Sequence, residues 1–404
     1  MRILVLDTIH GGREIGEAFA VAGHAVDMVD VYRGSTPDTT KEAKKKEYDL
    51  IVSPVHLDPD HPLIKKGNTV ISHHEAVRLL LGDRVPVLMV EITGSRGKTT
   101  TAYALAGLLP GKGVLHTSSG TYSYPGKTLI WKKSITPASV LAAADYAREM
   151  NGWLIAEESL GVTGAGNLAI ITSDEDYSFA SGKKYALAEK LASTRRVKQL
   201  LVAKGVVTRH PDVIHVDDVV NGEGMNCSAE RDGMKFQLTN PLFILPPYRS
   251  ALQLAAAAAM ILHIDPTPLS TFAALPGRMS VHHVRDLIII DNANSGTNVA
   301  TTLCAARYAR HCARMNELTL VIGKMEGDGA VCEGFSAEQI KYAISHVHPD
   351  SVIWVGEFPE PGSEMYRELG PGIDAICSTL EEGKDIAVRK AKKGSIVLAV
   401  KTWR

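Results

Sequence analysis

The residues best suited to chemistry lie in one short segment, Thr93-Gly94-Ser95-Arg96-Gly97-Lys98-Thr99-Thr100. An apolar run at residues 87–90 predicts a strand before it, and residues 101–109 predict a helix after it. A glycine turn between a strand and a helix lets backbone N–H groups and the helix dipole face phosphate oxygens. Lys98 would then contact the β- and γ-phosphates, and the Thr99 hydroxyl would bind Mg²⁺. The segment indicates an ATP-dependent enzyme or a nucleotide-driven switch, although Ile92 replaces the first glycine of the common pattern.

A second candidate is the acidic run Glu157-Glu158-Ser159, which follows a predicted buried strand at residues 153–156. Ligands of open α/β sheets gather at the carboxyl ends of the strands. Glu157 could therefore hold Mg²⁺ beside the phosphates of ATP. The alternative is an exposed acidic turn.

A third candidate comprises Pro276-Gly277-Arg278-Met279 and the run Asp291-Asn292-Ala293-Asn294-Ser295-Gly296. The second run follows a predicted strand at residues 287–290. Asp291 and Asn294 suit a ribose or a phosphate, and the Arg278 guanidinium can pair with a phosphate in a planar fork. The alternative for each piece is a turn between domains.

Composition restricts the class of protein. Among 404 residues, 44 are Lys or Arg and 45 are Asp or Glu, which leaves a net charge of -1. This balance argues against a protein that binds nucleic acid or a membrane surface. The five cysteines form no C-x-x-C pair and indicate free thiols in a reducing compartment. With no leader-like start and no apolar run long enough to span a bilayer, we expect a cytoplasmic protein.

Strands alternate with helices along the chain, which predicts an α/β fold with mostly parallel sheets. We expect three domains, at residues 1–86, 87–275 and 276–404. Strands are predicted at residues 3–6, 25–31, 50–52, 69–71, 153–156, 168–172, 287–290, 318–322, 352–355 and 396–400. Helices are predicted at residues 13–22, 138–149, 184–203 and 251–262, and residues 41–47 are expected to be a solvated helical face.

In this order, the motifs resemble those of the Mur ligase family, the ADP-forming ligases that include folylpolyglutamate synthases. Thr93 to Thr100 looks like that family's T-G-T-x-G-K-T-T loop, and Glu157-Glu158-Ser159 is similar to its E-x-S-S motif. Thr136-Pro137 matches a T-T-P element, and Leu275 to Met279 looks like L-P-G-R-M. The resemblance covers residues 87–404. It implies a small N-terminal α/β domain, a central P-loop ATPase domain and a C-terminal Rossmann-like domain that closes over ATP.

The resemblance also implies roles for single residues. It assigns Glu157 to Mg²⁺, and Asp291, in a segment similar to D-Y-A-H, to the nucleotide. Lys190 falls near the place where many members carry a carbamylated lysine close to a second Mg²⁺.

Some segments depart from the family pattern. The H-N-x-x-N motif used around adenine reads Tyr248-Arg249-Ser250-Ala251-Leu252, and the D-H-x-D segment reads Asp174-Glu175-Asp176-Tyr177. The basic motif that recognises the incoming amino acid has no counterpart at residues 355–359, and the chain ends at residues 401–404 where longer members continue. An ATP site without an amino-acid site is therefore expected.

Several segments look more like one archaeal branch of the family, which makes the nickel tetrapyrrole coenzyme F-430. They are residues 6–12, 29–34, 72–77, 246–251 and 291–296. The resemblance implies that ATP activates a propionate of a nickel-containing tetrapyrrole precursor, and that the activated carbonyl closes a carbocyclic ring. Alternatives are a ligase that joins an amino acid to a carboxylate, such as a pseudomurein peptide ligase, and a nucleotide-dependent switch without ligase chemistry.

His10 is a candidate for the base that generates the carbon nucleophile, because it follows a strand in a glycine-containing segment. The alternative is a histidine that only caps this turn. His56, His61, His73 and His74 have no compact metal-binding spacing, so we expect them to belong to a histidine-rich surface.

Overall fold

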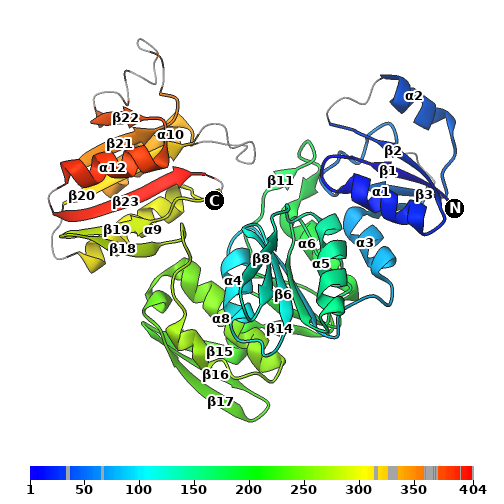
Figure 1. Cartoon of the computed structure of the whole chain (residues 1–404), viewed down its shortest axis with the longest axis horizontal. Coiled ribbons are helices and arrows are strands. Elements are labelled where there is room, and N and C mark those ends of the chain that lie inside the picture. Colours follow the sequence, from blue (N-terminus) through cyan, green and yellow to red (C-terminus); the bar gives the residue numbers. More distant parts are fainter. Residues whose placement is uncertain are drawn as a thin grey trace. The chain divides into compact units, whose positions relative to one another are not determined.

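The computed structural model describes residues 1–32, 37–64, 68–313, 317–325, 335–358, 360, 367, 369, 372–391 and 393–402. Some residues of the sequence patterns above, namely Arg33, Gly34, Cys332, Pro359, Trp403 and Arg404, lie outside the described residues. The chain divides into two compact units, Met1–Phe272 and Ala273–Arg404. Each unit is built on parallel β-sheet with helices on its faces (Figure 1).

The first unit begins with a four-stranded parallel sheet in the order β2-β1-β3-β4. Its strands are β1 (Arg2–Leu6), β2 (Ala25–Val29), β3 (Leu50–Ser53) and β4 (Val70–Ser72). Its helices are α1 (Gly12–Val21), α2 (Pro37–Lys45) and α3 (His73–Leu81). Ser72 begins α3 with a capping box, in which its hydroxyl accepts a hydrogen bond from the N–H of Glu75. All four strands run the same way, so their carboxyl ends share one edge of the sheet.

The same unit contains an eight-stranded sheet in the order β14-β13-β10-β5-β9-β6-β7-β8, which is parallel from β14 to β6. Its strands are β5 (Met89–Thr93), β6 (Gly113–Thr117), β7 (Gly120–Tyr124), β8 (Thr128–Trp131), β9 (Trp153–Glu157), β10 (Leu168–Ile171), β13 (Gln199–Val202) and β14 (Val213–His215). The principal helices are α4 (Lys98–Ala106), α5 (Pro137–Glu149), α6 (Ala186–Ser193) and α8 (Pro246–Ile261). The shorter elements are β11 (Ser178–Phe179), β12 (Lys184–Tyr185), α7 (Val216–Val219), β15 (Val220–Glu223), β16 (Asn226–Arg231) and β17 (Met234–Thr239).

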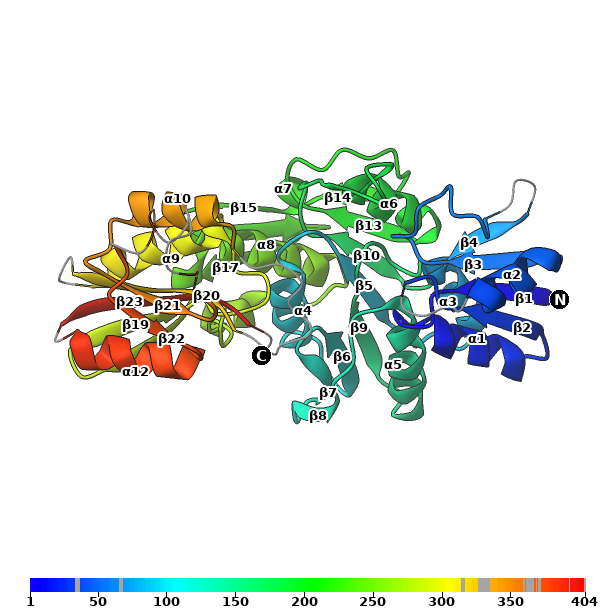
Figure 2. The same ribbon diagram turned by 90° about the horizontal axis from the view of Figure 1, so that it is seen from above.

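One hydrophobic core joins the two sheets of this unit. It contains Ile3 and Val52 from the small sheet, Val77 from α3, Ala143 from α5 and Leu154 from the large sheet, all without solvent exposure. Helices α1 and α3 contact α5 between the sheets, as Figure 2 shows. Burial of this apolar surface, at roughly 25 cal/mol per Å², stabilises the packing of the small sheet and its helices against the large sheet and α5.

The prediction of one long helix at residues 184–203 is wrong. The structure has β12, then α6, then a single 3-10 turn at Thr194–Arg196, then β13. The prediction followed the helix-favouring residues of this segment, but the run Gln199–Val202 pairs with β10 in the sheet interior. Tertiary pairing overrode local propensity here.

The second unit is a six-stranded sheet in the order β18-β19-β23-β20-β21-β22. Its strands are β18 (Ser280–Val284), β19 (Leu287–Asp291), β20 (Leu318–Lys324), β21 (Ser351–Val355), β22 (Ala375–Cys377) and β23 (Gly394–Lys401). Its helices include α9 (Val299–Cys312), α10 (Ala337–Val347) and α12 (Leu380–Lys390). Helices α9 and α10 pack together over one face of this sheet, while α12 covers the other (Figure 2). Within the described ranges, no helix of either unit is both long and apolar enough to cross a membrane.

Candidate active site

The predicted phosphate-binding loop at residues 93–100 (the phosphate loop) has the expected strand–turn–helix geometry: β5 ends at Thr93, α4 begins at Lys98, and a tight turn joins them. Gly94 (φ 150°) and Gly97 (φ 84°) hold backbone conformations that favour glycine. A Cβ atom on Gly94 would also lie 2.1 Å from Thr172 Oγ1, so the neighbouring strand end leaves no room for a side chain. The residue before α4 is Gly97, which has no side chain to cap the helix, so the N–H groups at the start of α4 are suited to an anion.

The two residues that follow β10 support the phosphate loop through hydrogen bonds. The Thr172 hydroxyl lies 2.5 Å from the Arg96 carbonyl oxygen and 3.2 Å from that of Thr93. Ser173 Oγ accepts the N–H groups of Ser95 and Arg96 at 3.0 and 3.4 Å. These contacts fix the turn before any ligand binds, which reduces the ordering that a ligand must impose.

Three polar groups meet behind the loop. Thr99 Oγ1 donates to Glu157, with separations of 2.9 and 3.1 Å to its two carboxylate oxygens. The N–H of Ser118 donates to the same carboxylate at 3.1 Å. Thr99 and Glu157 are only 4% and 2% exposed. A hydroxyl and a carboxylate at this spacing are the oxygen ligands that Mg²⁺ prefers, so the residues fit the predicted metal role.

Lys98 and Lys190 approach the loop from two sides. Lys98 Nζ donates to the Gly94 carbonyl at 3.0 Å, and Lys190 Nζ donates to Ser95 Oγ at 3.0 Å. Lys190 is 1% exposed and its ammonium lies 5.3 Å from the centre of the Tyr177 ring. Burial, followed by the positive charge of Lys98, lowers the pKa of Lys190 to about 8. The structure thus brings Lys190 to the phosphate loop, where it contacts Ser95.

A second, deeper carboxyl group lies next to Glu157. Glu158 is fully buried, and neither of its carboxyl oxygens has a hydrogen-bond partner of good geometry among the described residues. Its neighbour Glu91 accepts hydrogen bonds from the Thr163 hydroxyl at 2.5 Å and from the N–H groups of Gly164 and Gly166 at 3.1 and 2.8 Å. Burial, followed by the Glu91 charge, raises the pKa of Glu158 well above its usual range. We assign the proton to Glu158, because the three donors stabilise the ionised form of Glu91.

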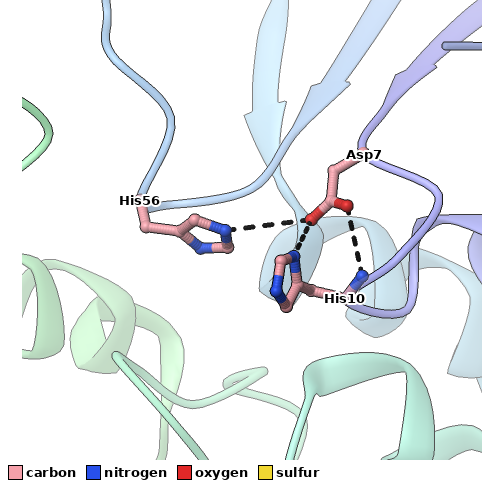
Figure 3. A group of neighbouring side chains, drawn as sticks. All are labelled: Asp7, His10 and His56. Carbon is pink, nitrogen blue, oxygen red and sulfur yellow. Dashed lines mark hydrogen bonds and ion pairs between the residues drawn. The ribbon is translucent and has the colours of Figure 1, made fainter. Parts of the chain in front are cut away.

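His10 lies in the first unit, at the carboxyl end of β1, where it has two close neighbours (Figure 3). Its Nδ1 lies 2.8 Å from Asp7 Oδ2, and His56 Nε2 lies 3.8 Å from the same oxygen. Asp7 is completely buried. Burial, followed by the nearby His10, lowers the pKa of His56.

Two of the histidines expected on the surface are instead buried. His73 and His74 are 2% and 3% exposed. Each donates from Nε2 to a backbone carbonyl, His73 to Leu6 at 2.9 Å and His74 to Ser159 at 3.0 Å. Burial lowers their pKa values to about 4 and about 3, so both are neutral. The sequence expectation failed because these residues open α3, whose buried face joins the two sheets.

The residues predicted to contact the nucleotide from the second unit, Arg278, Asp291 and Asn294, lie close together. Asp291 ends β19 and accepts the Ala293 N–H at 3.1 Å. Asn294 donates from Nδ2 to the Gly277 carbonyl at 2.7 Å, which brings the loop that carries Arg278 beside the end of β19. The role of these three residues at a nucleotide stays a prediction.

The sequence patterns did not single out five residues that lie at these sites: Asp7, His56, Ser118, Thr172 and Ser173. Each follows the end of a strand in one of the two parallel sheets. That position was the available signal, because strand ends of a parallel sheet meet at a shared edge.

Comparison with known proteins shows to which family the chain belongs. Over 466 aligned positions, the chain is 30% identical to the protein named coenzyme F(430) synthetase of Methanosarcina acetivorans, covering 94% of this chain and 98% of that one. The chain belongs to the coenzyme F430 synthetase family. A second member, from Methanocaldococcus jannaschii, is 22% identical over 92% of this chain and 93% of its own length. Residues 281–402 match the family domain described as coenzyme F430 synthetase CfbE, C-terminal domain.

Solved structures confirm the Mur ligase-like fold of this F430 synthetase family member. FolC of E. coli in complex with ADP superposes with a TM-score of 0.60 at 15% identity, over 82% of this chain and 90% of that one. The MurF ligase of Thermotoga maritima in complex with ADP gives a TM-score of 0.54 at 16% identity, over 93% and 90%. The predicted resemblance and fold class are therefore confirmed.

Proposed function

We propose that this chain is an ATP-dependent, ADP-forming ligase that completes coenzyme F-430. Its substrate would be the nickel-containing seco-tetrapyrrole precursor, and its product would contain one more carbocyclic ring. The observation that carries the proposal is the cluster of Lys98, Thr99 and Glu157 at an uncapped helix N-terminus, in a chain of this family.

The first step would make an inert carboxylate electrophilic. A propionate oxygen attacks the γ-phosphorus of ATP, ADP leaves, and an acyl phosphate forms. Lys98 would neutralise charge on the phosphates, and the N–H groups at the start of α4 would bind them. Thr99 and Glu157 would hold Mg²⁺, which supplies further charge neutralisation when bound. We also propose that Lys190, whether carbamylated or free, takes part in catalysis near the phosphates of ATP.

The second step would form the carbon–carbon bond. A carbon atom of the macrocycle loses a proton and attacks the acyl carbon, and inorganic phosphate leaves. Because nucleophile and electrophile belong to one molecule, holding the macrocycle in a folded conformation supplies much of the acceleration. We place the proton acceptor at His10, whose ring is oriented by the buried Asp7 carboxylate.

In this proposal residues 1–86 bind the tetrapyrrole, residues 87–275 bind ATP, and residues 276–404 supply further nucleotide-binding residues. Arg278, Asp291 and Asn294 would contact the nucleotide. The hydrogen bond from Asn294 to the Gly277 carbonyl, next to Arg278, supports a shared role.

The test is incubation of the purified chain with ATP, Mg²⁺ and the nickel seco-tetrapyrrole, without any amino acid. We expect ADP and phosphate in equal amounts and a tetrapyrrole lighter by one water, measured by mass spectrometry. Strict dependence on an added amino acid would instead identify an amide-forming ligase. Slow hydrolysis of ATP at a rate that no added carboxylic acid changes would identify a nucleotide-dependent switch without ligase chemistry.

A further inference from the structure

The cluster of Asp7, His10 and His56 has the composition of a metal site. Strands β1 and β3 are adjacent and parallel, with Val5 opposite Val52, so their carboxyl ends lie together. Asp7 comes directly after β1, His10 lies in the turn before α1, and His56 follows β3 (Figure 3). Three potential ligands from two chain segments therefore converge at one edge of the sheet.

The geometry favours a shared ion over a simple hydrogen-bonded pair. Asp7, His10 and His56 each offer one ligand atom, and these three atoms all lie within 4.8 Å of one another. The His56 separation of 3.8 Å from Asp7 is too long for a hydrogen bond, yet Figure 3 shows its nitrogen directed at that oxygen. Bonds of about 2.0–2.2 Å to one tetrahedral ion would place the ligand atoms about 3.3–3.6 Å apart, between the observed 2.8 and 3.8 Å.

The surroundings hold these ligands in place. Asp7 Oδ1 accepts the backbone N–H groups of Ile9 and His10 at 2.8 and 3.2 Å, which leaves Oδ2 for the cluster. The ring of Tyr32 stacks on His56 with centroids 5.2 Å apart and meets His10 edge-on at 5.4 Å. The two imidazoles are nearly perpendicular, at 88°. Such outer contacts fix ligand orientation in known metal sites.

We propose that Asp7, His10 and His56 bind one divalent transition-metal ion through Oδ2, Nδ1 and Nε2. Two imidazoles and one carboxylate select borderline ions such as Zn²⁺, Co²⁺ or Ni²⁺ over Mg²⁺ and Ca²⁺. The side chains of His10 and His56 are 48% and 31% exposed, whereas Asp7 is buried. The ion would therefore be held from one side and keep positions open for water or a substrate oxygen.

The site lies in the same unit as the phosphate loop. Lys184, in β12, donates from Nζ to the Val55 carbonyl at 2.8 Å, next to His56. Tyr177, just before β11, lies beside Lys190, which contacts Ser95 of the phosphate loop. If the proposed function holds, hydroxide on the bound ion, left when a water of lowered pKa loses a proton to solvent, would be the proton acceptor in place of the His10 imidazole.

The experiment needs neither nucleotide nor tetrapyrrole. The full-length, untagged chain is stripped with a chelator and titrated with Co²⁺ by visible absorption and with Zn²⁺ by calorimetry. We expect one ion per chain, unaffected by millimolar Mg²⁺. His10→Ala and His56→Ala should each weaken binding by about 100-fold or more.

The matched control is His61→Ala, which changes the same loop as His56 outside the cluster. It should bind Co²⁺ like the wild-type chain. Absence of stoichiometric binding, or equal binding by His10→Ala, His56→Ala and the unaltered chain, overturns the proposal. ADP formation by the unaltered chain is measured separately, so failure of the metal site and failure of the proposed ligase function give different results.

Discussion

Replacing Glu158 with Gln should stabilise the protein increasingly as the pH rises. The native state keeps a proton on Glu158, because the carboxyl group is buried beside the ionised Glu91. The unfolded chain releases that proton near pH 4.3. The stability contributed by the raised pKa is therefore complete below about pH 4.3 and is lost as the pH rises toward the native pKa. Gln resembles the protonated acid, since its amide can donate to Glu91, but it does not titrate.

The magnitude follows from proton linkage. Each pH unit between the unfolded and native pKa values changes the free energy of unfolding by about 1.4 kcal/mol. Between pH 5.5 and 7.5, the advantage of Glu158→Gln over wild type should therefore grow with pH, at up to this amount per pH unit, for as long as the native carboxyl group keeps its proton. The measurement is urea denaturation followed by circular dichroism at pH 5.5, 6.5 and 7.5. Glu149→Gln, at the exposed end of α5, is the matched control and should show no such trend.

Two outcomes would refute this reasoning. A stability difference for Glu158→Gln that stays constant over the three pH values would mean that the native carboxyl group is ionised. A variant less stable than wild type at pH 7.5 would mean that Gln cannot replace the protonated acid. The site itself should survive the change, because the bond from the Thr93 hydroxyl goes to the backbone carbonyl of Glu158.

Other predictions concern the phosphate loop. Lys98→Ala should abolish ADP formation, by about 100-fold or more, while leaving the near-ultraviolet circular dichroism unchanged; activity within a few-fold of wild type would contradict its assignment. Glu157→Gln should raise the Mg²⁺ concentration needed for half-maximal turnover, and an unchanged Mg²⁺ curve would exclude Glu157 as a ligand. With a pKa of about 8, roughly a tenth of Lys190 is neutral at pH 7 and the neutral fraction rises with pH. Because only a neutral amine forms a carbamate, removing bicarbonate at pH 7 should lower turnover of the wild type and leave Lys190→Met unaffected; equal responses would contradict carbamylation.

Local sequence patterns determined the parts of this protein that a short segment can encode. The turn from Thr93 to Lys98 needs glycine at two positions and a strand and a helix on either side, and all of these lie within a few residues. Thr99 and Glu157 were also predictable one at a time, because each follows a strand that the apolar pattern reveals. The α/β class followed from the same alternation of strands and helices.

Only the tertiary structure decided which distant groups meet. Ser95 and Lys190 are 95 residues apart, and Glu91 and Thr163 are 72 apart, yet each pair is joined by a hydrogen bond. Asp7 and His56 meet because β1 and β3 are neighbours, and the buried His73 and His74 belong to a helix packed between two sheets. Strand order and shared burial arise from the whole chain minimising its exposed apolar surface, so no single segment carries that information.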